Sequence, residues 1–291
     1  MKRALKNCDA LRFEEFFHGG QTGTFFKIKE MICSKQTAYQ RIDIFDTDNA
    51  GRVFALDGII QTIERFEFIY HEMLVHVPMF SPSSPERVLI IGGGDGGTLR
   101  EVLRHEQVEE AHMCEIDEEV VLAAKEYLPS LSSAMEDERA RLFYTAGAEY
   151  VSQFQEFFDV ILIDSTDPTA GEGGNLFTEG FYTNCKDALT KDGLLVAQTE
   201  NPVYDTSWLE MAYGRIDMAF PSVKMYKGFS PQYPSGFWTY TMGMKGDKSI
   251  AKKRDDNALE KELQYYSSDI HASSFVLPPF LKESLATLKE V

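Results

Sequence analysis

The chain has few of the residues that mark metal-binding and disulfide-stabilised proteins. Its four cysteines lie far apart and form no CxxC pair: Cys8, Cys33, Cys114 and Cys185. This spacing argues against a zinc site or a disulfide framework, and free buried thiols are the better interpretation. Among six histidines, His71 and His76 form HExxxH, one residue too long for the helical zinc motif. We therefore expect no metal.

Long apolar runs and positive charge are also scarce. No apolar run approaches the roughly 18–20 residues that cross a bilayer, and residues 1–15 lack the apolar segment of a secretion signal. We therefore expect a cytoplasmic protein. The 29 basic residues are outnumbered by 46 acidic ones, and the formal net charge is −17. This balance argues against nucleic acid or a membrane surface as partner. It is compatible with a cationic substrate, although solubility alone also explains it.

The first part of the chain has the pattern of antiparallel strands. Residues 25–64 alternate between apolar and polar side chains, and the turn signal Asn49-Ala50-Gly51 separates 40–46 from 52–56. A length of 291 residues with 43% hydrophobic residues suits one large domain or two unequal ones. A small N-terminal β domain is the prediction for this region.

A helix is expected next, over residues 66–77, followed by a linker that contains Pro78, Pro82 and Pro85. We place the domain boundary in this linker. Residues 1–80 would form the β domain with its connecting helix, contributing to oligomerisation and to part of the active site. Residues 81–291 would form the catalytic domain with a C-terminal tail.

Buried strands dominate the second part of the chain. Continuous apolar runs occur at 87–91, 111–116, 141–145, 159–164 and 193–198. Runs without alternation indicate strands covered on both faces, and hence a parallel sheet with crossover helices. We expect a Rossmann-like, doubly wound α/β domain. A short helix at 257–265 and an extended stretch containing Pro278-Pro279 are expected to follow.

The ends of these strands carry the candidate site, because ligands in such sheets bind beyond the carboxyl ends of the strands. The first strand runs into IIGGGDGGT, in which Gly92 and Gly94 allow close approach to a ligand and Asp95 would repel a phosphate. The second strand ends at Glu115, about twenty residues after the glycines, which is the spacing of a carboxylate that binds a ribose. Alternatively, Glu115 and Asp117 are acids at a helix start.

The run at 159–164 ends in Asp164, Ser165 and Asp167. Asp164 and Asp167 could instead cap a helix and start a turn. However, Asp95 would then share one crevice with both of them, and no basic residue lies beside the three acids in sequence. Such crowding is costly unless a cation occupies the space. A polyamine or a sulfonium co-substrate fits, whereas the carboxylate of an ordinary methyl donor would be disfavoured by Asp95.

Together these motifs identify a family resemblance. In order, the chain contains Leu56-Asp57-Gly58, EFIYHEM at 67–73, GGGDGGTLREV, CEID, DSTDP and Tyr233-Pro234-Ser235-Gly236. Over roughly residues 10–245 the chain resembles the spermidine synthase (polyamine aminopropyltransferase) family. The tracts DSTDPTAGEGGNLF, QTENPVYD and HASSFVLPPF are most similar to the Thermotoga-like bacterial branch.

The resemblance implies a reaction. An aminopropyl group would pass from decarboxylated S-adenosylmethionine to putrescine, giving spermidine and 5′-methylthioadenosine without a metal. It also implies homodimers or homotetramers joined through the N-terminal strands.

Roles for individual residues also follow from the resemblance. Asp164 would be the general base, and Tyr70 would lie beside the attacking nitrogen. The amine groups of the two substrates would be bound by His71, Asp95, Asp167, Tyr233 and Gln198. The nucleoside would be held by Gln40, Gly92, Gly94, Asp95, Glu115, Ala146, Gly147 and Ser165. Without the resemblance, a core histidine would be the better interpretation of His71.

The chain departs from the family pattern in three places. Ala146-Gly147 replaces the usual Asp-Gly that contacts the adenine amino group, so adenine must be recognised by other groups. Ala170-Gly171 replaces the usual Gly-Pro, and Phe66 replaces the first Asp of the motif before the helix. None of these changes affects the proposed base or the acidic cluster.

Other functions remain open at this point. The same reaction could use agmatine, cadaverine or spermidine as acceptor. A methyltransferase that uses intact S-adenosylmethionine is an alternative, although Asp95 and the paired acids argue against it. A polyamine-binding sensor without catalysis is a third possibility, although a sensor would need no base at Asp164.

Overall fold

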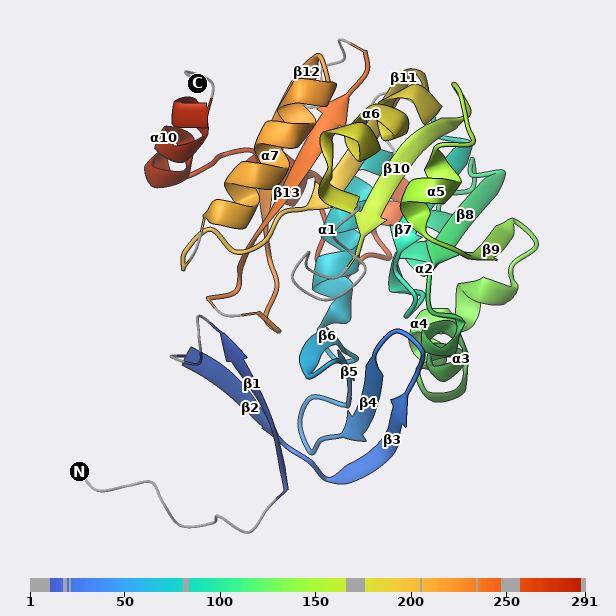
Figure 1. The fold of residues 1–291 in the computed structure, drawn as a ribbon, viewed down its shortest axis with the longest axis vertical. Coiled ribbons are helices and arrows are strands. Elements are labelled where there is room, and N and C mark those ends of the chain that lie inside the picture. Colours follow the sequence, from blue (N-terminus) through green and yellow to red (C-terminus); the bar gives the residue numbers. More distant parts are fainter. Residues whose placement is uncertain are drawn as a thin grey trace.

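The N-terminal part of the chain forms two antiparallel sheets, seen at the bottom of Figure 1 in a computed structural model of the protein. The structure describes residues 11–17, 20, 22–80, 84–165, 176–204, 206–233, 235–246 and 257–288. The first sheet pairs β1 (Arg12–Phe17) with β2 (Thr22–Lys27). The second has the order β3 (Glu30–Gln36), β4 (Arg41–Asp46), β5 (Arg52–Leu56) and β6 (Ile59–Ile63). The hairpin predicted between 40–46 and 52–56 is confirmed as β4 and β5.

Helix α1 (Glu67–Met79) connects these sheets to the rest of the chain and is buried along most of its length. Its N-cap is Phe66, which supplies no side-chain hydrogen bond. The helix continues through Pro78, so the prediction that this proline begins the linker is wrong. A proline in the last turn removes only one helical hydrogen bond, and Val77 and Met79 on either side are fully buried. Packing of these apolar neighbours therefore keeps the last turn helical.

A seven-stranded sheet forms the centre of the molecule, in the order β12-β13-β11-β10-β7-β8-β9 (Figure 1). Its strands are β7 (Arg87–Gly92), β8 (Glu110–Glu115), β9 (Ala140–Tyr144), β10 (Phe158–Asp164), β11 (Leu189–Gln198), β12 (Ser222–Phe229) and β13 (Phe237–Met244). The five predicted parallel strands are confirmed. Two further strands, β12 and β13, extend the sheet in antiparallel pairing beyond β11. The predicted doubly wound architecture is therefore present.

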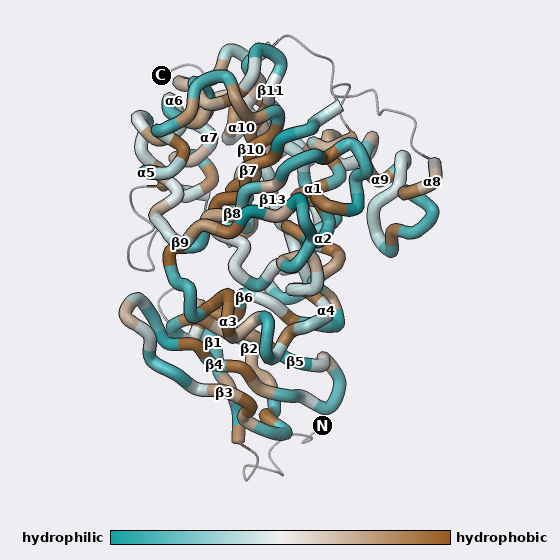
Figure 2. The backbone as a smooth tube through the Cα atoms, turned by 90° about the vertical axis from the view of Figure 1, so that its right-hand side faces the viewer, coloured by the Kyte–Doolittle hydropathy of each residue, from teal (hydrophilic) through white to brown (hydrophobic). Residues whose placement is uncertain are grey.

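Both faces of the sheet are buried, which explains why its strands lack alternation. In β7, Val88 and Ile90 face one apolar cluster, and Leu89 and Ile91 face the other. Figure 2 shows the hydrophobic colour concentrated on these central strands. The helices are α2 (Gly97–Leu103), α3 (Glu118–Tyr127), α4 (Pro129–Ser132), α5 (Gly147–Val151), α6 (Glu179–Ala188) and α7 (Ser207–Ala219), with a 3₁₀ turn at Ser133–Glu136.

The C-terminal segment is more helical than its sequence suggested. It contains α8 (Asn257–Glu260), α9 (Ser268–Ser274) and α10 (Pro279–Leu288). The predicted helix at 257–265 is limited to its first turn, and the predicted extended stretch is wrong from Pro279 onward. Proline is well tolerated as the first residue of a helix, where its missing N–H needs no partner. Within the described ranges, no helix has the length and hydropathy needed to cross a bilayer.

Candidate active site

A cavity of about 250 Å³ lies at the carboxyl ends of the central strands. Its centre is the point where the strand order reverses. From β7 the chain continues to β8 and β9 on one side of the sheet, and then returns to place β10 on the other side of β7. There Gly92 at the end of β7 is in register with Asp164 at the end of β10. Ligands of open α/β sheets bind at such a switch point. Phe54 and Leu56 of the N-terminal sheet form part of the opposite wall.

The turn after β7 needs its glycines. Gly92 has φ +83°, and a Cβ there would lie 2.2 Å from the backbone oxygen of Asp164. A Cβ on Gly94 would lie 2.9 Å from a carboxylate oxygen of Glu115. Only glycine at these two positions allows the loop to lie against the neighbouring strand ends. The predicted close approach of backbone to the cavity is therefore present.

Asp95 is buried in the cavity wall, with 7% of its surface exposed. One carboxylate oxygen accepts the backbone N–H of Gly97 at 2.9 Å, and the other accepts the hydroxyl of Thr62. The nearest cationic group is the His71 ring, whose Nε2 lies 3.7 Å from Asp95. The acid that lacked a basic neighbour in sequence therefore has one in space, supplied by α1.

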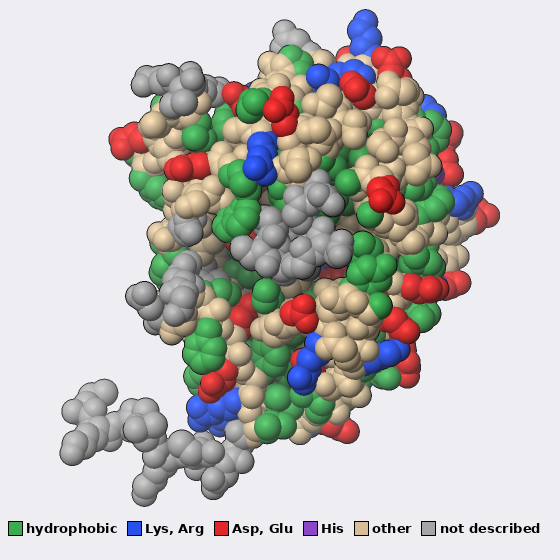
Figure 3. Space-filling model, viewed as in Figure 1, with side chains coloured by type: hydrophobic (Ala, Val, Ile, Leu, Met, Phe, Trp, Pro, Cys, Tyr) green, Lys and Arg blue, Asp and Glu red, His purple; other side chains and the backbone are tan. Residues whose placement is uncertain are grey.

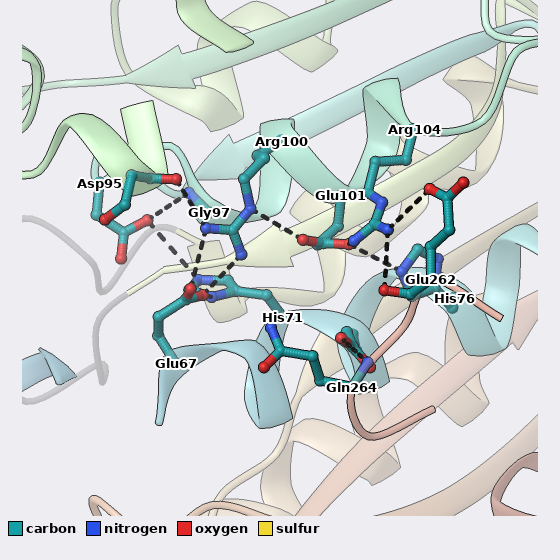
Figure 4. Close-up of polar contacts among 12 residues, drawn as sticks. Glu67, His71, His76, Asp95, Gly97, Arg100, Glu101, Arg104, Glu262 and Gln264 are labelled. Atoms are coloured by element: carbon teal, nitrogen blue, oxygen red, sulfur yellow. Dashed lines mark hydrogen bonds and ion pairs between the residues drawn. The ribbon is translucent and has the colours of Figure 1, made fainter. Parts of the chain in front are cut away.

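His71 is held from its other side (Figure 4). Its Nδ1 lies 2.6 Å from Glu67 Oε2, and Arg100 on α2 donates two hydrogen bonds of 2.9 Å to the same Glu67 carboxylate. Burial favours the neutral ring, but the negative charges of Asp95 and Glu67 outweigh it and raise the pKa of His71 to about 9. The histidine is therefore a cavity residue and a cation at neutral pH.

Asp164 and Tyr70 form a hydrogen-bonded pair at the switch point. The Tyr70 hydroxyl donates to Asp164 Oδ1 at 2.7 Å, and the Thr98 hydroxyl donates to Oδ2 at 2.5 Å. Burial raises the pKa of Asp164, while the charge of His71 and the two hydrogen bonds act in the opposite direction. Burial also raises the pKa of Tyr70 well above its usual value, so Tyr70 stays a donor.

The acids at the end of β8 and just after it, Glu115 and Asp117, have different roles. Asp117 is the N-cap of α3, accepting the N–H of Glu119 at 3.2 Å, and it also accepts Gln40 Nε2 at 3.2 Å. Glu115 lines the cavity and accepts the N–H of Asp117 at 3.0 Å. Burial is the main cause that raises the pKa of Glu115 to about 7. The helix-start interpretation is thus correct for Asp117, whereas Glu115 faces the cavity.

The remaining predicted residues line the same cavity, with one exception. The cavity wall includes Gln40, Ala146, Gly147, Ser165, Gln198 and Tyr233. The Ser165 hydroxyl is buried without a hydrogen-bond partner among the described residues. Tyr233 stacks on Trp238 with ring centroids 4.0 Å apart. Asp167 lies outside the described residues, as do Ala170 and Gly171.

Four residues that support the cavity were not predicted from the sequence: Thr62, Glu67, Thr98 and Arg100. Thr98 was visible as the residue after the glycine turn, in the first turn of α2. Thr62 and Arg100 carried no such signal, because their contacts join segments that are distant in sequence. No cluster of His, Cys, Asp and Glu suited to a metal ion occurs in the part of the chain that the structure describes.

The arrangement is suited to a polar, positively charged ligand. Carboxylates from three strand ends face one enclosed space, and one of them has a tyrosine partner. On the face of the molecule shown in Figure 3, basic side chains are scattered and form no continuous patch. This distribution offers no track for an anionic polymer on that face.

Comparison with known proteins agrees with this geometry. The chain matches the spermine/spermidine synthase domain over residues 67–254 and the spermidine synthase tetramerisation domain over residues 13–64. It is 50% identical over 290 residues to the polyamine aminopropyltransferase of Thermotoga neapolitana, covering 99% of this chain and 98% of that one. The Thermotoga maritima enzyme of the same name is similar to the same extent, and that of Clostridium kluyveri is 43% identical over 259 residues, covering 89% of this chain and 93% of that one.

Solved structures agree as well. A spermidine synthase in complex with the transition-state analogue AdoDATO has a TM-score of 0.92 and 50% identity, covering 99% of both chains. The spermidine synthase of Thermotoga maritima has a TM-score of 0.91 and 49% identity, covering 99% of this chain and 98% of that one. The resemblance and the fold class inferred from the motifs are confirmed. The chain belongs to the spermine/spermidine synthase family of polyamine aminopropyltransferases.

Proposed function

We propose that the chain transfers the aminopropyl group of decarboxylated S-adenosylmethionine to putrescine, with Asp164 as general base. The observation that carries this proposal is the Asp164–Tyr70 pair, which lies at the switch point inside a cavity bordered by Asp95 and Glu115. A spermidine synthase that is similar along its whole length binds the transition-state analogue AdoDATO.

The reaction is a displacement at the carbon next to the sulfonium. The amine nitrogen forms a bond to that carbon, the carbon–sulfur bond breaks, and its electron pair makes sulfur a neutral thioether. Methylthioadenosine therefore leaves without being protonated. The nitrogen loses one proton, which we assign to Asp164. No metal is needed for this sequence of bond changes.

The reaction is limited by the small fraction of the acceptor amine that is unprotonated. An alkyl amine with a pKa near 10.4 is neutral in only about one molecule in a few thousand at pH 7. Burial raises the pKa of Asp164 and so makes it a stronger base than an exposed carboxylate. The Tyr70 hydroxyl donates a hydrogen bond to Asp164 Oδ1 and so orients the carboxylate. General-base assistance of this kind is typically worth about 10²–10⁴-fold.

The donor is proposed to lie along the glycine turn. Glu115 would bind the ribose, and His71 with Asp95 would receive the ammonium of the aminopropyl group. The rest of the nucleoside would contact Gln40, Gly92, Gly94, Ala146, Gly147 and Ser165. Because Ala146 has no polar side chain, adenine would be recognised by backbone groups or by the unpartnered Ser165 hydroxyl.

The acceptor is proposed to lie between Tyr70 and the end of β11. Tyr233 and Gln198 line this side of the cavity. On the motif alone, Asp167 is proposed to bind the distal ammonium of the diamine. Putrescine is the proposed acceptor, and agmatine, cadaverine and spermidine are the amines to compare with it.

The test replaces Asp164 with asparagine and uses Asp217→Asn on α7, an exposed position, as the matched control. Asp164→Asn should bind the donor nearly normally while turnover falls at least about a hundredfold, and the control should behave as wild type. Mass spectrometry of a mixture of donor and amines should identify methylthioadenosine and the lengthened amine. Unchanged turnover in Asp164→Asn would remove it from the base role.

We also propose a homotetramer assembled through the N-terminal region, residues 1–80, in which residues 13–64 match the tetramerisation domain of the family. The strands of the first sheet carry exposed apolar side chains that a partner would cover. Phe16 is 65% exposed and Phe25 is 57% exposed. Light scattering coupled to gel filtration should give four times the mass of the chain, and a monomer would refute the proposal.

A further inference from the structure

A row of buried charged groups leads from the cavity into the space between α1 and α2 (Figure 4). It runs from Asp95 to His71, then to Glu67 and finally to Arg100. Asp95, His71 and Glu67 are 7%, 3% and 6% exposed, so water screens their charges little. Each member therefore depends on its neighbours for charge compensation.

The packing orients the His71 ring. Nδ1 lies 2.6 Å from Glu67, and Glu67 is itself fixed by the two hydrogen bonds from Arg100. The ring lies against Gly97, where a Cβ would come within 2.3 Å of it. Nε2 is therefore the nitrogen that faces Asp95. Their separation of 3.7 Å is too long for a hydrogen bond, so charge alone pairs them.

The charge on His71 depends on groups from four elements. Asp95 after β7, Glu67 on α1 and Asp164 at the end of β10 face the ring with negative charge, while Arg100 on α2 acts through Glu67. The Tyr70 ring lies edge-on to the imidazole, with centroids 5.3 Å apart. Despite burial, the carboxylates raise the pKa of His71 to about 9, so the cavity wall presents an imidazolium at neutral pH. A second cation beside Asp95 would then meet a like charge in a poorly screened environment.

We propose that His71 exchanges its Nε2 proton for the ammonium of the donor, and that Glu67 and Arg100 are the positioning residues that make this exchange possible. The inference rests on the proposed function, in which that ammonium binds at His71 and Asp95. The Nε2 proton leaves to solvent, and the freed lone pair accepts a hydrogen from the ammonium. Nδ1–H continues to donate to Glu67. No bond of the donor changes in this step.

The exchange keeps the charge of the cluster constant. Before binding, His71 supplies one positive charge next to Asp95, and afterwards the ammonium supplies it. Burial acts to raise the pKa of Glu67, but the hydrogen bond and charge of His71, followed by those of Arg100, lower it overall. When the His71 ring becomes neutral its charge no longer helps, and the two hydrogen bonds from Arg100 are what keep Glu67 an anion. The site therefore has no uncompensated buried charge either before binding, with His71 protonated, or afterwards, with the ammonium bound.

The experiment counts protons released when the donor binds. Titration calorimetry at pH 7 in phosphate and in Tris gives the number of protons, because the two buffers differ in ionisation enthalpy. Two probes are compared, namely decarboxylated S-adenosylmethionine and methylthioadenosine, which lacks the ammonium. Both place a nucleoside near Glu115, so any proton change there cancels in the comparison. We expect the donor to release about one proton more than methylthioadenosine.

Four variants assign the proton. His71→Asn and Glu67→Gln should each release less than half of the extra proton, because the ring is either absent or neutral before binding. Glu110→Gln is the matched control, since Glu110 pairs with His112 at 3.1 Å at the start of β8, the end of the strand opposite the cavity. Donor binding to Glu110→Gln should release the full extra proton, as in the wild type. Asp164→Asn should also still release it, which separates His71 from the base.

A second measurement works on the wild-type protein alone. Nitrogen NMR of histidine-labelled protein should show His71 change from imidazolium to the neutral Nδ1–H form when the donor is added. Donor binding without an extra proton, or an imidazolium that persists in the complex, would overturn this inference and leave the proposed function intact. A donor that does not bind would instead overturn the proposed function itself.

Discussion

Replacing Gly97 by alanine tests the packing that orients His71. The new Cβ would lie 2.3 Å from Cε1, 2.5 Å from Nε2 and 2.6 Å from Nδ1 of the ring, whereas ordinary contact begins at 3.4 Å. Gly97 is not among the glycines with positive φ, so alanine suits its backbone, and the three nearest atoms to the new Cβ all belong to the His71 ring. The ring must therefore move by about 1 Å, and Glu67 opposes that movement.

A displacement of about 1 Å at a positioned group costs on the order of 10²-fold in rate, which corresponds to about 2.7 kcal/mol of transition-state stabilisation. We expect kcat/KM for decarboxylated S-adenosylmethionine to fall by about this factor. Binding of methylthioadenosine, which has no ammonium, should change little. Initial rates and titration calorimetry measure the two quantities, and circular dichroism confirms that the variant is folded.

Gly214→Ala is the matched control for this prediction. Gly214 lies inside α7, and a Cβ there would meet nothing within 4 Å. Alanine should stabilise the helix by about 0.5–1 kcal/mol and leave activity unchanged. If Gly97→Ala keeps more than half of the wild-type kcat/KM, the ring is not held in the way described.

Three further variants test other contacts. Thr98→Val removes a hydrogen bond that lowers the pKa of Asp164, so the acidic limb of the kcat/KM profile should move to higher pH. Glu72→Gln weakens the acceptor for the N–H groups of residues 264–266 and should cost about 1.5–3 kcal/mol in urea unfolding. Glu101 has its pKa lowered to about 2, against burial, by its histidine and arginine partners. Its contribution, about 3 kcal/mol, should be present above pH 4.5 and disappear as the pH falls through 2, so the stability difference from Glu101→Gln should vanish there.

The sheet could be predicted because its strands are covered on both faces. Runs such as Val88–Ile91 have no polar position, and a strand of that kind belongs to a parallel sheet. The end of α1 and the start of α10 were harder to predict, since a proline such as Pro78 or Pro279 usually indicates that a helix is interrupted. In the fold one lies in a last turn and the other in a first turn, where proline costs little. The burial that decides such cases is not visible in a local pattern.

The candidate site was predictable where chain direction determines position. Asp95, Glu115 and Asp164 follow strands that are parallel, so their side chains meet at one edge. Contacts between separate elements were not predictable. Arg100 reaches Glu67 across 33 residues of sequence, and only the packing of α1 on α2 brings them together. The charge of His71 depends on that packing too.

The carboxylate of Glu72 has a consequence for any attempt to shorten the protein. Residues 67–254 match the spermine/spermidine synthase domain, yet Glu72, in that range and next to His71, accepts N–H groups from residues 264–266. A version that stops at residue 254 would leave this anion in the interior without those donors, in the helix that also carries Tyr70 and His71 of the cavity wall. The minimal working enzyme therefore extends past the recognised domain.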